Sequence, residues 1–260
     1  MKPSTNKPEK PTSDEGVRLS KRVAALFSCS RSEAEHYIEG GWVSVDGVVV
    51  EMPQFRVLDQ TVTLAADASL APPPSITLLY HKPAGQLVGA DNVNSIGSAV
   101  LREITSANRA SDDRSGCAML QQHLARLTLP CPLEPAASGL VVLTQDGRIT
   151  RKLIEDAKTI EQEIIVEVRE NKDVLSNSGL QRLNFGLAYQ GKPCQPMKVS
   201  WQNENRLRFA VKAPLPGQIE DMCKTVGLSV VSIKRIRIGR LSMAGLPASQ
   251  WRYLGDHERF

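Results

Sequence analysis

One stretch near the middle of the chain brings a single acidic side chain to the start of an apolar strand. Residues 133–147 read LEPAASGLVVLTQDG, so Glu134 precedes a run of apolar residues that ends at the turn Asp146-Gly147. A carboxylate placed just before a buried strand is held rigidly, as catalytic groups commonly are. Glu134 is therefore the candidate catalytic residue, and the alternative is a turn carboxylate that caps backbone N–H groups or faces water.

The composition allows a folded core around this stretch. The 260 residues are 41% hydrophobic and 23% charged, and the formal net charge of +4 mildly favours an anionic partner. Five scattered cysteines form no C-x-x-C pair, and the four histidines lack metal-ligand spacing. We expect a cytoplasmic protein without a metal site. No apolar run is long enough to cross a membrane, so we expect no membrane partner.

A proline-rich segment divides the chain into domains. Residues 1–16 offer almost nothing to bury and predict a disordered tail. Residues 65–75 (AADASLAPPPS) favour an extended linker. A compact unit at residues 17–64 and a larger domain at residues 76–260 therefore flank this linker.

Local signals in residues 17–64 predict two helices and a small sheet. Leu19 and Val23 recur at helical spacing, with Ser20 as the expected N-cap. Ser30-Arg31-Ser32-Glu33 is a capping box, which starts the second helix. The expected strands are residues 42–45, 48–50 and 57–64.

The order R-L-x-K, then S-R-x-x-A-x-x-x-I-x-x-G-x-V-x-V-D-G, resembles the S4 RNA-binding domain over residues 17–64. The resemblance implies that basic side chains contact structured RNA, because arginine pairs bidentately with phosphate. The matching residues are Arg18, Lys21, Arg22 and Arg31. The alternative is a solvated charged face.

Strands and helices are interspersed irregularly in the larger domain, which favours an α+β fold with a mixed sheet. Residues 89–118 are small and polar and predict a surface loop around a short helix near residues 96–104. The other expected strands are residues 76–80, 163–168, 198–201, 206–211 and 230–238, and the other expected helices are residues 148–156, 174–184 and 218–226.

Four ordered motifs of the larger domain resemble the RsuA/RluF-type pseudouridine synthases that modify ribosomal RNA. They are LLYHKPAG (78–85), the stretch 133–147, EQEIIVEV (161–168) and the closing segment 216–254. This family joins an S4 domain to a catalytic domain. The resemblance implies that a flipped uridine is isomerised without a metal or organic cofactor, and that Glu134 occupies the position of the catalytic aspartate.

Basic residues of two of these motifs are further candidates for contact with RNA phosphates. Lys82 follows the first strand of the larger domain, and Lys234, Arg235 and Arg237 lie in its last strand. For both groups the alternative is an ordinary solvated charge. We expect the partner to be structured RNA, ribosomal RNA above all, and the protein to act as a monomer.

The sequence departs from the family pattern around the expected pocket. Glu134 replaces the aspartate, Cys131-Pro132 replaces Gly-Arg, Ile164 replaces the tyrosine that stacks on uracil, and Glu220-Asp221 replaces two arginines. An extra methylene moves the carboxylate by roughly 1 Å, which can lower a rate about a hundredfold. These changes predict an RNA-binding protein whose isomerase activity is weak or lost. The alternatives are an active synthase that uses Glu134, and a ribosome-assembly or protein-interaction module on the same fold.

Overall fold

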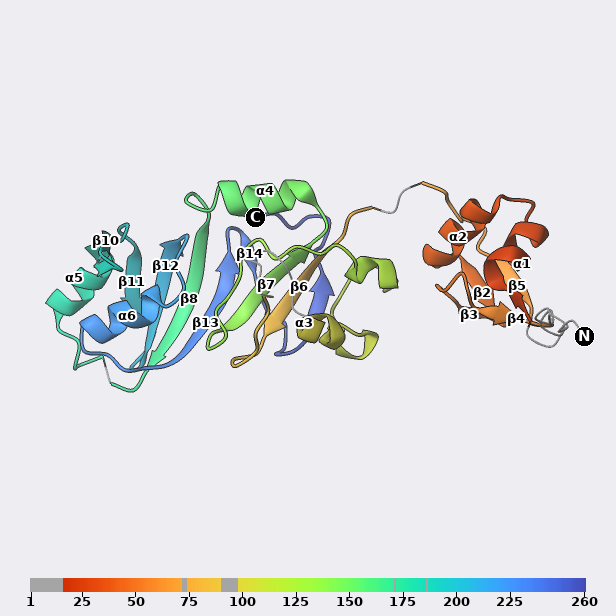
Figure 1. Ribbon diagram of the computed structural model, residues 1–260. Helices are drawn as coiled ribbons and strands as arrows, with labels where there is room; N and C mark the ends of the chain where they lie inside the picture. The colour runs from red at the N-terminus through yellow and green to blue at the C-terminus, as the bar shows by residue number, and fades with distance from the viewer. Residues whose placement is uncertain (1–15, 72–73, 90–97, 171, 186) are drawn as a thin grey trace, which may run out of the picture. The chain divides into compact units, whose positions relative to one another are not determined.

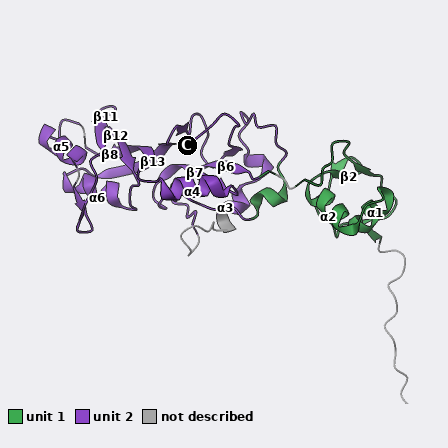
Figure 2. Ribbon diagram, turned by 90° about the horizontal axis from the view of Figure 1, so that it is seen from above, with its two compact units in different colours: residues 1–74, 119–125 green, residues 75–118, 126–260 purple. Residues whose placement is uncertain are grey.

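The computed structural model describes residues 16–71, 74–89, 98–170, 172–185 and 187–260 (Figure 1). The expected tail at residues 1–16 lies outside these ranges except for Gly16, as do parts of the linker and of the loop 89–118. Two compact units make up the chain, drawn in green and purple in Figure 2. Unit 1 comprises residues 1–74 and 119–125, and unit 2 comprises residues 75–118 and 126–260.

The segment 119–125 is the one part of the larger domain that the structure assigns to unit 1. Within unit 1, the backbone N–H of Gln121 donates a hydrogen bond of 2.6 Å to the carboxylate of Glu51. The side chain of Leu120 also packs against the backbone of Gly41. The expected place of this segment in the larger domain is wrong, because the contact that joins it to unit 1 links residues about 70 positions apart and leaves no local pattern.

Unit 1 consists of two helices on a small sheet. The helices are α1 (Leu19–Leu26) and α2 (Arg31–Glu39). The strands β2 (Val43–Val45), β3 (Val48–Val49) and β5 (Val62–Leu64) form an antiparallel sheet in the order β3-β2-β5, and β1 (Val17–Arg18) pairs with β4 (Arg56–Val57). The core buries Leu19, Val23, Ala34, Ile38 and Val43, which the helical and strand periodicities predict.

The start of α2 confirms the capping box, since the Ser30 side chain accepts from the Glu33 N–H and Glu33 accepts from the Ser30 N–H. The expected cap at Ser20 is wrong. Ser20 is a buried residue inside α1, and the N-cap position is Arg18, because β1 runs directly into the helix. The expected strand at residues 57–64 is interrupted: β4 pairs with β1, and β5 pairs with β2.

Unit 2 is built on a mixed sheet in the order β11-β12-β8-β13-β7-β6-β15, with β14 paired to β13. All of its neighbouring strands are antiparallel except β13 and β7. Its strands are β6 (Thr77–Lys82), β7 (Ser138–Thr144), β8 (Glu161–Val168), β11 (Lys198–Trp201), β12 (Arg206–Lys212), β13 (Val230–Ile238), β14 (Leu241–Ser242) and β15 (Trp251–Tyr253). The expected α+β fold with a mixed sheet is confirmed.

Helices cover this sheet at two places (Figure 1). Helix α5 (Asn177–Phe185) packs beside β11 and helix α6 (Gln218–Thr225) beside β13, and Leu183 and Met222 join one core cluster with apolar residues of the sheet. Helix α4 (Gly147–Glu155) follows β7 and buries Leu153 in a second core cluster. The remaining elements of unit 2 are α3 (Ser98–Glu103), a 3-10 turn (Ser106–Asn108) and a hairpin of β9 (Ala188–Tyr189) and β10 (Lys192–Pro193); a second 3-10 turn (Gln121–Leu124) belongs to unit 1.

The long elements of unit 2 lie where the sequence pattern predicts them, whereas its shortest strands do not follow from that pattern. The five expected strands and the helices α4, α5 and α6 are present, with ends shifted by up to three residues. Strands β9, β10, β14 and β15 were not expected, because two or three residues are too few to show a periodic pattern. Their positions depend on the strands with which they pair.

Candidate functional site

Glu134 lies in the turn before β7, and its carboxylate reaches the beginning of α6. Its Oε2 accepts a hydrogen bond of 2.9 Å from the backbone N–H of Gly217, the N-cap residue of α6. A carboxylate is stabilised at this end of a helix because the first N–H groups are unpaired and carry partial positive charge. Among the described residues, no Lys or Arg forms an ion pair with Glu134, so its contact is that of a capping carboxylate.

A pocket of about 400 Å³ opens beside this carboxylate. Its described lining includes Glu134, Arg235 and Gln162, and is otherwise mainly aliphatic and proline side chains, with no aromatic ring. Ile164 on β8 forms part of the wall with 3% of its surface exposed. The volume is suited to a small planar ligand. The walls offer apolar contact but no stacking partner.

Lys82 is fully buried behind the Glu134 turn, at the end of β6. Its ammonium donates hydrogen bonds to the carbonyl oxygens of Pro83 and Pro135, each at 2.9 Å, and to that of Ala137. Burial lowers the pKa of Lys82 to about 8, which the negative charge of Glu134 opposes and the positive charge of Arg235 assists. The expected phosphate contact of Lys82 is therefore wrong, because this ammonium has no access to solvent and holds the turn that carries Glu134.

Arg235 is also an internal residue, with 2% of its surface exposed. Its guanidinium donates to the carbonyl oxygens of Leu140 (2.9 Å), Cys131 (2.8 Å) and Pro132 (3.2 Å) and to the side-chain oxygen of Gln162. These hydrogen bonds connect the Cys131-Pro132 turn to β7. Arg235 therefore holds this wall of the pocket in place. The expectation that Arg235 contacts RNA phosphate is wrong for the same reason as for Lys82.

The other two basic residues of β13 have different surroundings. Arg237 forms ion pairs with Glu163 (2.9 Å) and Glu161 (2.6 Å), so its charge is compensated inside the protein, and its expected phosphate contact stays a prediction. Burial opposes ionisation of Glu163, but hydrogen bonds from Arg208 and Arg237 hold its pKa below the usual value. Lys234 is half-buried and does not line the Glu134 pocket, whereas its neighbours Ile233 and Arg235 do.

The other departures from the family pattern are Cys131-Pro132, which borders the Glu134 pocket, and Glu220-Asp221, which does not. Cys131 and Pro132 line the pocket. Glu220 and Asp221 lie in the first turn of α6 but outside the pocket lining, and Glu220 pairs with Lys224 at 2.7 Å. Neither of these two acids therefore borders the pocket beside the Glu134 carboxylate.

Unit 1 carries a basic pocket of about 340 Å³. Arg18, Lys21 and Arg31 line it together, as the sequence motif predicts, and Arg22 is exposed outside it. Arg56 joins them, although no local motif marks it, because β4 pairs Arg56 directly with Arg18 of β1. Four cations around one cavity present a local positive surface that suits phosphate groups.

Metal-binding clusters and membrane-spanning helices are both absent from the described residues. No group of three or more His, Cys, Asp or Glu side chains in these ranges is arranged to hold a metal ion. None of the helices in the same ranges is long and apolar enough to cross a membrane.

Comparisons with known proteins agree with both units. Residues 17–62 match the S4 domain family. An uncharacterised RNA pseudouridine synthase of Aquifex aeolicus is 24% identical over 93% of this chain and 94% of its own length. The dual-specificity RNA pseudouridine synthase RluF of Shigella flexneri is 26% identical over 94% of this chain and 78% of its own length.

A chloroplastic relative from Arabidopsis thaliana, described as a putative ribosomal large subunit pseudouridine synthase, is 27% identical over 85% of this chain and 54% of its own length. The crystal structure of a pseudouridylate synthase has the same fold, with a TM-score of 0.56, 17% identity, and coverage of 92% of this chain and 96% of that one. In its S4 domain, in its similarity to these relatives along nearly the whole chain and in its fold, this chain resembles the RsuA/RluF-type RNA pseudouridine synthases.

Proposed function

We propose that this protein binds structured RNA, with ribosomal RNA as the expected class, and isomerises uridine weakly or not at all. The RNA-binding surface is the basic pocket of unit 1, which is lined by Arg18, Lys21, Arg31 and Arg56. The Glu134 pocket of unit 2 is the remnant of the family's catalytic site. Both halves of the proposal are testable on the full chain.

The main observation in favour of weak or lost activity is the hydrogen-bond partner of the Glu134 carboxylate. A catalytic carboxylate must lie close to the nucleoside and stay ionised beside a cation. Here its Oε2 bonds to the backbone N–H of Gly217, and the nearby cations Lys82 and Arg235 have their described hydrogen bonds to other groups. The Glu134 carboxylate therefore caps α6 while it lines the pocket, and no cation among the described residues holds it in place for catalysis.

The wall of the pocket supports the same conclusion. Ile164 stands where the family has a stacking tyrosine, and no aromatic ring is among the described lining residues. Base-aromatic stacking contributes roughly 1–3 kcal/mol per base. A flipped uracil would therefore bind more weakly, and in a less defined orientation, than it would against a tyrosine ring.

Tritium release from uridine-labelled ribosomal RNA tests the activity. The RNA comes from a strain that lacks this protein, and the samples are wild type, Glu134→Ala and Glu134→Asp, with an RluF relative as positive control. We expect release by wild type and Glu134→Ala to be equally near background. Site-specific pseudouridine that disappears in Glu134→Ala would overturn the proposal.

Salt-dependent gel shifts with ribosomal RNA fragments test the binding. We expect wild type to bind at low salt and Arg31→Glu to bind more weakly, because a phosphate partner is replaced by a like charge. Arg182→Glu, an exposed arginine on α5, is the control with the same change in charge. No binding by wild type at low salt would instead favour an assembly or protein-interaction module.

The second candidate function is an active synthase that uses Glu134. It is favoured by the position of Glu134 on the wall of a pocket of suitable size and by its electrostatic coupling to the buried Lys82. Release of Glu134 from Gly217 would then be required to bring the carboxylate to the nucleoside. The tritium assay distinguishes this candidate from the first, since only an active synthase depends on Glu134.

A further inference from the structure

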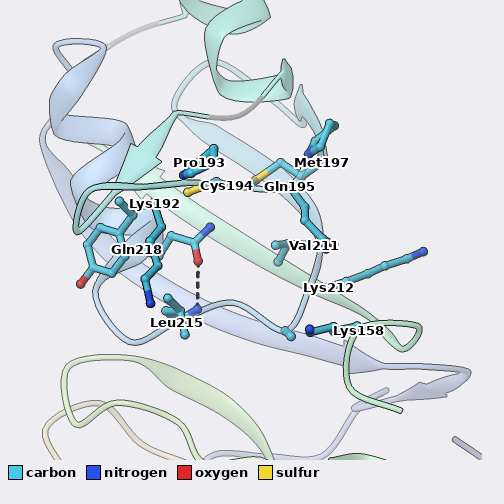
Figure 3. A pocket seen from close by; sticks show the side chains of 13 residues that line it. Lys158, Lys192, Pro193, Cys194, Gln195, Met197, Val211, Lys212, Leu215 and Gln218 are labelled. Atoms are coloured by element: carbon cyan, nitrogen blue, oxygen red, sulfur yellow. Dashed lines mark hydrogen bonds between the residues drawn. The ribbon is translucent and has the colours of Figure 1, made fainter. Parts of the chain in front are cut away.

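We propose that a second pocket of unit 2, the lysine pocket, holds the phosphodiester backbone of the RNA beside the Glu134 pocket. The lysine pocket has a volume of about 210 Å³, and its rim carries Lys158, Lys192 and Lys212 (Figure 3). This inference rests on the proposed RNA-binding function and names the part of the ligand that unit 2 takes. None of the sequence motifs marked these three lysines.

The three lysines supply positive charge without internal compensation. They come from the turn after α4, from β10 and from the end of β12, and all three are exposed. None of them forms an ion pair with another described residue, and Glu161, which faces Lys212 in the β8–β12 register, is bonded to Arg237. A concave site lined by uncompensated cations attracts an anion.

Two of the three lysines point toward the pocket. In Figure 3, Lys192 runs toward Leu215 and Lys158 points in from the opposite side, whereas Lys212 extends away from the pocket. Lysine binds phosphate as a flexible point charge, so the ammonium groups adjust to the strand that arrives.

The floor of the pocket is apolar and fixed. Met197 and Val211 are 8% and 3% exposed, and the buried Gln218 accepts a hydrogen bond of 3.0 Å from the N–H of Leu215 (Figure 3). This floor suits the sugar or one base edge below a phosphate. The volume lies below the range of about 300–1,000 Å³ that encloses whole small ligands, so a portion of a strand fits better than a free cofactor.

One segment connects the lysine pocket to Glu134. Ala213 and Leu215 line both pockets, and Gly217 of the same segment donates to the Glu134 carboxylate. The Tyr189 hydroxyl, beside Lys192, fixes this segment through a hydrogen bond of 2.7 Å to the Pro216 carbonyl oxygen. An RNA strand with one nucleotide at the Glu134 pocket therefore has its neighbouring phosphate at the lysine pocket.

Lysine acetylation followed by mass spectrometry tests the proposal on the unmodified full chain. The probes are a ribosomal RNA fragment that wild type shifts on gels, uridine monophosphate and polyglutamate. We expect the RNA to slow acetylation of Lys158, Lys192 and Lys212 severalfold, while the exposed Lys152 and Lys198, which line neither pocket, react at the same rate as before.

Equal reactivity of the three lysines in the presence and absence of bound RNA would overturn the proposal. So would protection by polyglutamate as strong as that by RNA, which would assign the pocket to an acidic peptide, or protection by uridine monophosphate alone. If RNA fails to bind at all on gels, the proposed function fails as well. If RNA binds but leaves these three lysines unprotected, the lysine-pocket inference fails and the proposed RNA-binding function stands.

A charge-neutral triple variant gives an independent measurement. We expect Lys158→Gln, Lys192→Gln and Lys212→Gln together to lower the slope of log affinity against log salt by roughly 2 to 3, because each phosphate contact contributes about 0.7–0.9. The control is Lys152→Gln with Lys198→Gln, two exposed lysines of unit 2 that line neither pocket. A control that lowers the slope by as much per substitution as the triple variant would overturn the proposal.

Discussion

Three basic residues of unit 2 show that a residue's role here depends on its partners more than on its type. Lys82, Arg235 and Arg237 all lie in motifs that suggested phosphate contact. Lys82 and Arg235 instead hold backbone carbonyl groups of the turns around Glu134, and Arg237 holds two glutamates. Their positive charge is already neutralised or hydrogen-bonded inside the fold, because removing it from water without partners would be very unfavourable.

Replacement of Lys82 should destabilise the protein strongly. Lys82→Met keeps the length of the side chain but leaves the carbonyl groups of Pro83, Pro135 and Ala137 without their donor. We expect the free energy of unfolding to fall by about 2–4 kcal/mol. Urea denaturation measures it, with Lys152→Met on the exposed face of α4 as a control that should change by less than about 0.5 kcal/mol.

The difference in stability between wild type and Lys82→Met should depend on pH. The folded pKa of Lys82 is about 8, below the usual 10.5 that applies to the unfolded chain. Between these values the unfolded state binds more protons, so the stability of wild type relative to Lys82→Met should rise with pH from about 8 to 10.5. The expected rise is on the order of 1 kcal/mol per pKa unit, and a difference that stays constant across this range would contradict it.

At the scale of elements, the parallel contact between β7 and β13 positions the site. Gly139 of β7 pairs with Arg235 of β13 and has a φ of +117°, a conformation that favours glycine. A Cβ atom at Gly139 would lie 2.1 Å from the carbonyl oxygen of Arg235. The absence of a side chain therefore lets the Glu134 turn approach the strand that supports the pocket.

Gly139→Ala should consequently disrupt this strand pair. We expect a loss of at least about 3 kcal/mol in the free energy of unfolding, or failure to fold, because backbone atoms cannot move aside as a flexible side chain could. Gly147→Ala is the matched control, since nothing lies within 4 Å of a Cβ at the first residue of α4. Thermal melts should show the control unchanged or up to about 1 kcal/mol more stable; equal melting of both variants would contradict the argument.

The capping box makes a smaller and separate prediction for α2. Ser30→Ala removes the oxygen that accepts from the Glu33 N–H at 3.2 Å. We expect a loss of about 1 kcal/mol, measured by chemical denaturation of the full chain. Ser32→Ala, at an exposed position in the first turn of the same helix, should change stability by less than about 0.5 kcal/mol. A larger effect at Ser32 than at Ser30 would contradict the cap.

At the scale of the whole molecule, each unit carries its own basic pocket. In unit 1 the pocket includes Arg18 and Lys21, and in unit 2 it includes the three lysines of the lysine pocket. If both hold the same RNA, their electrostatic contributions should add, because separate phosphate contacts release counterions independently.

Combined variants test this addition. Arg18→Gln with Lys21→Gln should lower the salt slope of RNA binding by roughly 2, and addition of the lysine-pocket triple variant should lower it by roughly 2 to 3 more. Fluorescence anisotropy across a salt series measures both steps. If the second set of substitutions has no further effect once the first is present, the two pockets do not bind the RNA together.

Much of the fold could be read from local patterns. The capping box at Ser30, the apolar run of β7 and the final strand β13 each follow from residues that are neighbours in sequence. The ordered motifs also led to the family. The site itself was only half predictable, because Glu134 and Ile164 were identified by position, whereas Gly217 was not.

By itself, the sequence determined the long helices and strands, the family and the candidate carboxylate, since each depends on a motif or a periodicity of nearby residues. The tertiary structure decided which charges remain available. In the folded chain Lys82 and Arg235 are buried, and Arg237 is paired with Glu163. Arg56 lies beside Arg18. One pocket is lined by Lys158, Lys192 and Lys212. The physical reason is that the type of a charge is a local property, whereas its burial and its partners depend on strand pairing between distant parts of the chain.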